Sequence, residues 1–208
     1  MKILKYSNEF SYFCNTFFVV DRDKNALIVD PGDINGGLEQ FIDEKQLNIV
    51  GVLLTHTHYD HIALLPKLIS KFNPTIFVSS EDFKIINDKY LNVAIYLNPK
   101  HDFKVKSDKF YIFKDYEVVK FMDFEFECIK TPFHTRGSSC FLFKELNSLF
   151  AGDTLFKDTI GRYDLPNSQP HKIKESLGKL NKLDHKLDVF SGHGEKTVLK
   201  NEMKHYFK

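Results

Sequence analysis

The sequence lacks the features that mark several protein classes. Its 208 residues contain no tryptophan and only three cysteines, Cys14, Cys128 and Cys140, which are scattered and form no C-x-x-C pair. This excludes a disulfide framework, and we expect three buried, reduced thiols. Lys and Arg number 29 against 28 Asp and Glu. A net charge of +1 creates no field that would attract a polyanion, so we expect no nucleic-acid partner.

Long hydrophobic runs are also missing. No apolar run reaches the roughly 18 residues that a membrane-spanning helix needs, and the longest clean one, residues 49–54, has the length of a strand. Residues 1–10 alternate charged and apolar side chains and hold no apolar core of a secretory signal. We therefore expect a cytoplasmic protein without membrane association. A composition of 42% hydrophobic and 27% charged residues is that of an ordinary globular protein.

Strand and helix signals alternate along the chain without a linker or a composition break, which predicts one α/β domain over residues 1–208. We expect two sheets packed together, with helices covering the outside. A weak signal over residues 87–107 predicts a long connection or lid. Strands are predicted at 2–6, 12–20, 26–29, 49–54, 75–78, 117–120, 124–129, 140–144, 148–150 and 189–191. Helices are predicted at 36–46, 62–72, 83–87 and 171–183 and from Thr197 towards 207, with Ser80 and Thr197 as N-caps.

Residues 55–61, Thr-His-Thr-His-Tyr-Asp-His, lie between a buried strand and a helix and carry most of the candidate chemistry. In an extended segment alternate side chains share a face, so His56, His58 and Asp60 can converge, while His61 enters from the first helical turn. Imidazole and carboxylate are the ligands of Zn²⁺, Mn²⁺ and Fe²⁺. A loop of solvated histidines is the alternative, but four such groups would remain poorly satisfied without a cation to share.

Further candidate ligands each follow a predicted strand: His134, Asp153 and His193. Asp153 and His193 have glycine neighbours that let the backbone approach closely. Each of the three could be an ordinary turn residue on its own, but their common placement favours one shared site. The four ligands of residues 55–61 already exceed one three-ligand catalytic site, which indicates two neighbouring ions.

These motifs, with Asp30 at the end of an early strand, resemble the metal-binding motifs of the metallo-β-lactamase fold superfamily. The resemblance implies an αββα sandwich of two mixed sheets with helices on the outer faces, and a dinuclear metal site at one sheet edge. Zinc is the expected metal, with iron or manganese as alternatives. Asp30 would orient a ligand from behind. The implied ligand sets are His56, His58 and His134 for one metal and Asp60, His61 and His193 for the other, with Asp153 bridging both.

Three segments resemble the short glyoxalase II-like hydrolases within that superfamily: residues 30–33 (Asp-Pro-Gly-Asp), residues 151–156 (Ala-Gly-Asp-Thr-Leu-Phe) and residues 161–164 (Gly-Arg-Tyr-Asp). This resemblance implies hydrolysis of a small thioester such as S-D-lactoylglutathione. A hydroxide shared by two cations would attack the carbonyl, with Asp60 and Asp153 as catalytic carboxylates. Arg162 could bind a substrate carboxylate or form a structural ion pair with Asp164.

Other functions stay open. A mononuclear-iron persulfide dioxygenase of the same fold would hold one iron and consume oxygen, and the second ligand set disfavours it. A phosphodiesterase or nuclease is disfavoured by the near-neutral charge. A lactonase of the same fold remains an alternative, as does a metal-binding module without catalysis, which would bind metal and hydrolyse no activated ester.

Overall fold

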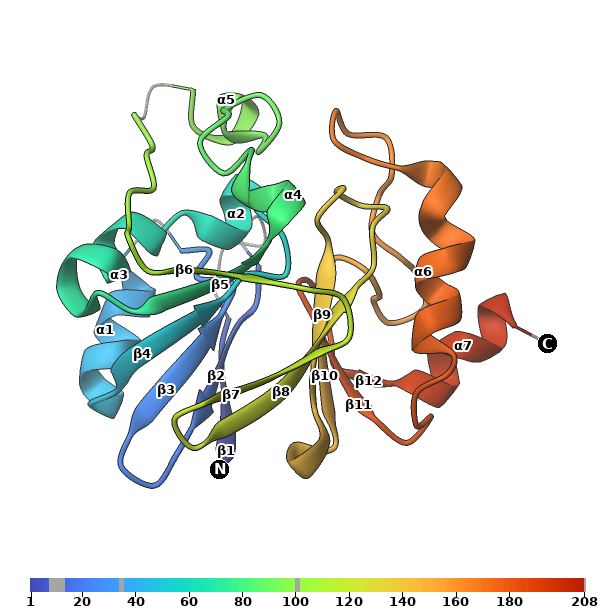
Figure 1. Cartoon of the computed structure of the whole chain (residues 1–208), viewed down its shortest axis with the longest axis horizontal. Coiled ribbons are helices and arrows are strands. Elements are labelled where there is room, and N and C mark those ends of the chain that lie inside the picture. Colours follow the sequence, from blue (N-terminus) through green and yellow to red (C-terminus); the bar gives the residue numbers. More distant parts are fainter. Residues whose placement is uncertain (8–13, 34–35, 100–101, 208) are drawn as a thin grey trace.

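Two six-stranded sheets form the centre of the molecule (Figure 1). The computed structural model describes residues 1–7, 14–33, 36–99 and 102–207. The first sheet runs in the order β1 (Lys2–Tyr6), β2 (Thr16–Val20), β3 (Asn25–Val29), β4 (Asn48–Leu53), β5 (Thr75–Ser79) and β6 (Phe110–Phe113). The second runs in the order β12 (Thr197–Val198), β11 (Asp188–Ser191), β10 (Ser148–Gly152), β9 (Ser139–Phe143), β8 (Phe124–Lys130) and β7 (Glu117–Phe121).

Both sheets are mixed. Strands β3 to β6 are mutually parallel, while β1 and β2 are joined by antiparallel pairings. In the second sheet β10 and β11 are parallel and the other pairs are antiparallel. The helices are α1 (Gly37–Lys45), α2 (Tyr59–Ile62), α3 (Leu65–Phe72), α4 (Ser80–Phe83), α5 (Ala94–Leu97), α6 (Ile173–Leu180) and α7 (Leu199–Tyr206), with 3₁₀ turns at Lys144–Leu146 and Pro170–Lys172.

The alternation of side chains along each strand builds three apolar layers. Phe17 of β2 faces the second sheet, whereas the next residue, Phe18, packs towards the helices of the first sheet. In β9, Phe141 faces the first sheet and Leu142 packs towards α6 and α7. Figure 1 shows α1 and α3 beside one sheet and α6 and α7 beside the other. This is the predicted αββα sandwich.

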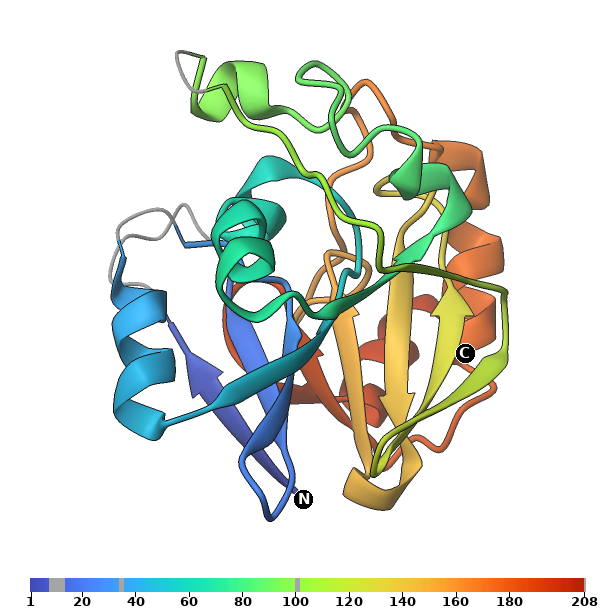
Figure 2. The same cartoon turned by 60° about the vertical axis from the view of Figure 1, so that its left-hand side comes forward.

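The parallel arrangement decides where the site lies. Strands β3, β4, β10 and β11 all end at one rim of the sandwich, because parallel strands share the edge at which their carboxyl ends lie. Strand β8 is antiparallel to β9, which is antiparallel to β10, so β8 ends at the same rim. The green segment that carries α5 lies over this end of the sheets (Figure 2).

Several predicted boundaries differ from the structure. The helix predicted at 62–72 is two helices, because Pro66 lies in the first turn of α3 and cannot continue the hydrogen bonding of α2. The connection predicted over residues 87–107 contains the short helix α5, and strand β6, which follows it, was not predicted. Residues 12 and 13 of the predicted strand 12–20 lie outside the described residues.

The two predicted helix caps are wrong by one residue each. Ser79, not Ser80, caps α4, because the Ser79 hydroxyl accepts a hydrogen bond from the Asp82 amide at 3.2 Å. Thr197 lies in β12 and its hydroxyl donates to the Glu202 carboxylate, while Val198 is the residue before α7. None of the helices in the described ranges is long and apolar enough to cross a bilayer.

Candidate metal centre

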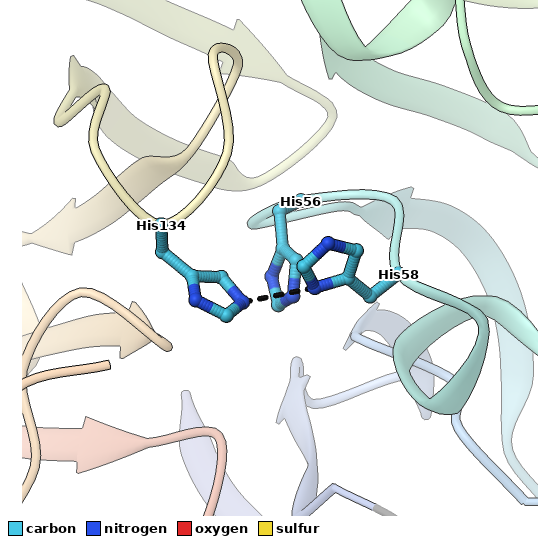
Figure 3. A group of neighbouring side chains, drawn as sticks. All are labelled: His56, His58 and His134. Carbon is cyan, nitrogen blue, oxygen red and sulfur yellow. Dashed lines mark hydrogen bonds between the residues drawn. The ribbon is translucent and has the colours of Figure 1, made fainter. Parts of the chain in front are cut away.

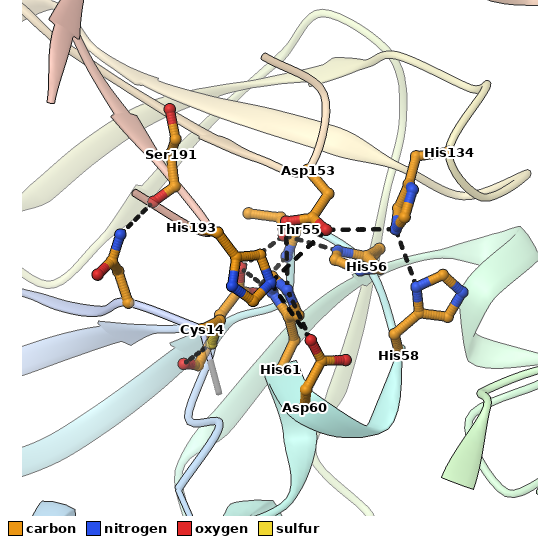
Figure 4. A network of polar contacts seen from close by, with 12 residues as sticks. Cys14, Thr55, His56, His58, Asp60, His61, His134, Asp153, Ser191 and His193 are labelled. Carbon is orange, nitrogen blue, oxygen red and sulfur yellow. Dashed lines mark hydrogen bonds and ion pairs between the residues drawn. The ribbon is translucent and has the colours of Figure 1, made fainter. Parts of the chain in front are cut away.

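The structure brings together the seven side chains that the sequence singled out as metal ligands. They come from both sheets: residues 56–61 follow β4, while His134, Asp153 and His193 follow β8, β10 and β11. Six of them form two groups, and within each group the potential ligand atoms lie within 4.8 Å of one another. The first group is His56, His58 and His134, and the second is Asp60, His61 and His193. Figure 4 shows both groups side by side.

Three histidines face one another in the first group (Figure 3). The ring centroids of His56 and His58, and of His56 and His134, are 4.7 Å apart, and those of His58 and His134 are 4.6 Å apart. His134 Nε2 lies 2.9 Å from His58 Nδ1. All three side chains are buried. The nearly equal spacing leaves one central point that all three rings share.

Hydrogen bonds fix the tautomers of His134 and His56. His134 Nδ1 lies 2.7 Å from the carbonyl oxygen of Arg162, which can only accept, so the ring proton is on Nδ1 and the lone pair is on Nε2. The Thr55 hydroxyl donates its proton to Asp30 Oδ2 at 2.6 Å. It must therefore accept from His56 Nδ1, 3.1 Å away, which again leaves the lone pair on Nε2.

Asp30 orients His61 in the second group. Its Oδ2 lies 2.9 Å from His61 Nδ1, and its Oδ1 accepts the amide hydrogen of Thr55 at 2.8 Å. With Nδ1 directed to Asp30, His61 turns Nε2 towards Asp60, whose Oδ2 is 3.7 Å away. Asp60 Oδ2 also lies 3.3 Å from His193 Nε2. A carboxylate that binds the outer nitrogen of an imidazole, as Asp30 binds His61 Nδ1, is the common arrangement for metal-binding histidines.

Asp153 lies between the two groups. Its Oδ1 is 3.3 Å from His61 Nε2, and its Oδ2 is 3.5 Å from His134 Nε2 and 3.8 Å from His193 Nε2. A Cβ atom on Gly192 would lie only 2.3 Å from Asp153 Oδ1, so this glycine lets β11 approach the carboxylate closely. The geometry is the one that a bridging ligand requires.

The donor set fits divalent cations. Among the described residues, His56 Nε2, His58 Nε2, His61 Nε2 and Asp153 Oδ1 are buried and have no hydrogen-bond partner. Unpaired buried polar atoms are costly, and two of these, His61 Nε2 and Asp153 Oδ1, lie 3.3 Å apart. His58 turns its other nitrogen, Nδ1, towards His134 Nε2. The second metal set that the sequence predicted therefore has the atoms to hold an ion, as does the first.

Burial and neighbouring charges prepare these groups for cations. Burial, reinforced by the nearby His134 imidazole, lowers the pKa of His58 to about 3. Burial alone would raise the pKa of Asp153, but the surrounding imidazoles, His61 above all, outweigh it and hold this pKa well below the ordinary range. Near neutral pH His58 is therefore an uncharged imidazole and Asp153 a carboxylate, which are the forms that bind metal.

Arg162 contributes to the site through its main chain and through its side chain, and the sequence indicated only the role of the side chain. Its carbonyl oxygen orients His134, as described above. Its guanidinium forms a two-pronged ion pair with Asp164, at 2.7 Å and 3.0 Å, as one of the two sequence-based interpretations proposed. The same side chain lines a cavity of about 470 Å³ that opens onto His58, Asp60, His134, Asp153 and His193.

Asp82, which the sequence did not single out, joins the two histidine loops. Its Oδ2 accepts from the Thr57 amide at 2.9 Å and from the Thr135 hydroxyl at 3.1 Å, and its Oδ1 accepts from the Gly137 amide at 3.0 Å. It is fully buried. An acidic residue after a strand is a weak sequence signal, and its partners are 25 to 55 positions away in the chain.

Comparisons with known proteins agree with this geometry. The Metallo-beta-lactamase superfamily matches residues 11–193. The hydroxyacylglutathione hydrolase GloC of Haemophilus influenzae is 32% identical over 189 residues, covering 90% of this chain and 89% of its own. The B3 metallo-beta-lactamase BLEG-1 is 27% identical with a TM-score of 0.88, covering 98% of this chain and 97% of its own.

A further solved structure has the same fold. TTHA1623, in a di-iron-bound form, has a TM-score of 0.78 at 24% identity and covers 90% of this chain and 91% of its own. The fold, the paired histidine and aspartate groups and the sequence match over most of the chain lead to one conclusion. This chain belongs to the metallo-beta-lactamase superfamily.

Proposed function

We propose that this protein is a metal-dependent hydrolase that cleaves a thioester, with S-D-lactoylglutathione as the first substrate to test. The observation that carries the proposal is the Asp153 carboxylate placed between two complete ligand groups, at the floor of a cavity that can admit a small molecule. The similarity to GloC of Haemophilus influenzae supports the substrate class. Two divalent ions, zinc foremost, would be held by His56, His58 and His134 and by Asp60, His61 and His193, with Asp153 between them.

When bound, such ions supply Lewis acidity and make water a nucleophile near neutral pH. The chain's own residues supply the rest. Asp60 and Asp153 are kept in their charged forms, because the neighbouring imidazoles more than offset the effect of burial and lower the pKa of each carboxyl group. They can therefore accept hydrogen bonds from an attacking water and orient it, but their low pKa makes them poor final acceptors of its proton. Water adds to the carbonyl carbon, the carbon–sulfur bond breaks, and the leaving sulfur takes up the proton.

The presence of both groups favours hydrolysis over the one-iron dioxygenase alternative, which needs only the first. The similarity to BLEG-1 makes a β-lactam the second substrate class to test. Elemental analysis of the purified protein, coupled to assays of thiol release from S-D-lactoylglutathione, of cephalosporin opening and of oxygen uptake, separates these functions. We expect two metal equivalents and thiol release. Oxygen uptake with one iron would contradict the proposal.

Asp153→Ala tests the placement of the shared carboxylate. We expect at least about a hundredfold loss of thiol release and a lower metal content, because the variant removes the group that faces both sites. Asp23→Ala is a matched control, since this carboxylate is exposed in the turn between β2 and β3 and does not line the cavity. Near-normal turnover of Asp153→Ala would refute the assignment.

A further inference from the structure

The cavity over the metal centre is lined by two unlike sets of side chains. One set consists of candidate ligands and Arg162, which are polar or charged. The other set, here called the apolar wall, consists of Val93, Tyr96, Leu97, Phe156 and Leu165. With a volume of about 470 Å³, the cavity falls in the range of small-molecule sites, which are mainly apolar with a few placed polar groups.

Two side chains of the apolar wall are exposed to solvent, although they are large and hydrophobic. Tyr96 is 63% exposed and Leu97 is 46% exposed, and both belong to α5. Exposed apolar side chains that gather at the mouth of a cavity commonly mark a ligand surface. Here they border the cavity that contains the candidate ligands.

The segment that carries these side chains is attached to the metal-binding loop. The amide of Tyr59, which lies between His58 and Asp60, donates to the Asn92 carbonyl at 2.8 Å. The Tyr59 hydroxyl accepts from the Asn98 side-chain amide at 2.9 Å. These two bonds lie on either side of α5, so its apolar side chains are held at a fixed place over the site.

Charge recognition is weak in the same cavity. Among the described residues that line it, Arg162 alone carries a permanent positive charge. Asp164 occupies the Nε edge of the guanidinium, at 2.7 Å from Nε and 3.0 Å from Nη2, and so neutralises its charge. A substrate carboxylate at the remaining edge would meet an ion pair instead of a free cation. The wall therefore offers much apolar surface and little to bind an anionic thiol such as glutathione.

We propose that this site selects thioesters by an apolar acyl chain of several carbons, which packs on Val93, Tyr96 and Leu97, and does not depend on carboxylates in the thiol half. This inference rests on the proposed thioester hydrolysis and specifies its substrate class.

An acyl series on one uncharged thiol tests the preference. We expect kcat/KM for acetyl, butyryl and hexanoyl thioesters of N-acetylcysteamine to rise by about fourfold for each added methylene that becomes buried. Replacing this thiol by glutathione at constant acyl chain should change kcat/KM by less than about fivefold. A flat acyl series, or a gain of more than about a hundredfold with glutathione, would overturn the inference.

Two neighbours in α5 provide a matched pair of variants. Leu97 lines the cavity and Ile95 does not, yet their exposed fractions are 46% and 45%. We expect Leu97→Ser to lower kcat/KM for the hexanoyl thioester about tenfold and for the acetyl thioester less than about threefold. Ile95→Ser should leave both values within about twofold of the unchanged protein. Equal losses in the two variants would contradict the inference.

Binding of uncleavable analogues separates this inference from the proposed function. Calorimetry with S-methyl and S-hexyl thioethers of N-acetylcysteamine should show tighter binding of the hexyl compound, weakened in Leu97→Ser only. If thioesters are cleaved but the chain length has no effect on binding, the inference fails alone. If no thioester is cleaved by the metal-loaded protein, the proposed function fails, and the preference for acyl chains fails with it.

Discussion

Three imidazoles of the centre are each oriented by a different kind of acceptor. His134 donates to a main-chain carbonyl, His56 to a hydroxyl and His61 to a carboxylate. In all three rings the nitrogen that faces the site is Nε2, and that of His134 lies 2.9 Å from His58 Nδ1. The Thr55 hydroxyl can accept from His56 only because it gives its own proton to Asp30. Asp30 thus fixes two histidines, one directly and one through Thr55.

Asp30→Asn should therefore disturb both. An amide NH₂ in place of one oxygen would put two hydrogen-bond donors face to face, at His61 Nδ1 or at the Thr55 amide. A ring facing this NH₂ would then adopt the other tautomer, with its proton on Nε2. We expect metal affinity to fall about 10- to 100-fold in chelator competition, with the far-ultraviolet circular dichroism unchanged. Asp21→Asn is the control, since Asp21 is a similarly hydrogen-bonded carboxylate in the turn before β3. Equal affinity in both variants would show that Asp30 does not orient the ligands.

The sequence identified the candidate ligands because they carry a local signal. Four lie within six positions, and His134, Asp153 and His193 each follow a predicted strand. Apart from Asp30, it did not identify the groups that position them. The Arg162 carbonyl exists in every residue type, so no side chain marks it. Asp82 and its partners are brought together only by the packing of two sheets.

At the scale of elements, α4 connects the two halves of the site. Asp82 accepts hydrogen bonds from the loop after β4 and from the loop after β8, so one carboxylate links a loop of the first sheet to a loop of the second. Burial raises its pKa to about 6 and exceeds the opposing effect of the Thr135, Thr57 and Gly137 donors. The nearby charge of Glu81 acts in the same direction as burial.

This raised pKa predicts a pH dependence of stability. The folded protein binds more protons at Asp82 than the unfolded chain does between the ordinary pKa of 3.8 and about 6. The contribution of Asp82 to the free energy of unfolding therefore falls as pH rises through this window, by about 3 kcal/mol in total. Urea unfolding should show the protein losing about 3 kcal/mol of stability relative to Asp82→Asn, whose amide does not ionise, between pH 4 and pH 7.

The comparison with Asp82→Asn cancels the titration of the site histidines, which both proteins share. A difference that stays constant from pH 4 to pH 7 would show that Asp82 does not titrate in this window. Asp21→Asn serves again as the control, because it removes a carboxylate that has no contact with the two loops.

Element boundaries were predictable where a signal was strong and local. β1 and the end of β3 match the prediction, since apolar and β-branched runs end at turn residues there. The break between α2 and α3 was missed, although Pro66 marks it, because the apolar spacing continues across the break. Strand β6 was missed because it forms through pairing with β5, at a distance of more than thirty residues.

At the scale of the whole molecule, the centre lies where two sheets meet. The ligands after β4 belong to the first sheet, and those after β8, β10 and β11 belong to the second. Cations held between them would add cross-links that the apolar layer between the sheets does not supply. Ions would also give partners to buried histidine nitrogens that otherwise make no hydrogen bond, such as Nε2 of His56 and His61, and unpaired buried polar atoms are costly.

Removal of metal should therefore lower the melting temperature. A ligand at a hundred times its Kd adds about 2.7 kcal/mol. For a chain of this size that corresponds to about 5–10 °C in Tm. We expect a chelator to produce such a drop in calorimetry, added Zn²⁺ to reverse it, and Asp153→Ala to show a smaller response.

Among the residues that the structure describes, one group of side chains outside the centre could also produce a metal response, and a variant separates it from the centre. Asp158, Glu202 and His205 also place potential ligand atoms within 4.8 Å of one another. The Glu202 carboxylate is already occupied, since it accepts hydrogen bonds from the Asp158 amide and the Thr197 hydroxyl. His205→Ala should therefore keep the full drop in Tm on chelation. If His205→Ala abolishes the drop and Asp153→Ala retains it, the stabilising metal lies at α7, not between the sheets.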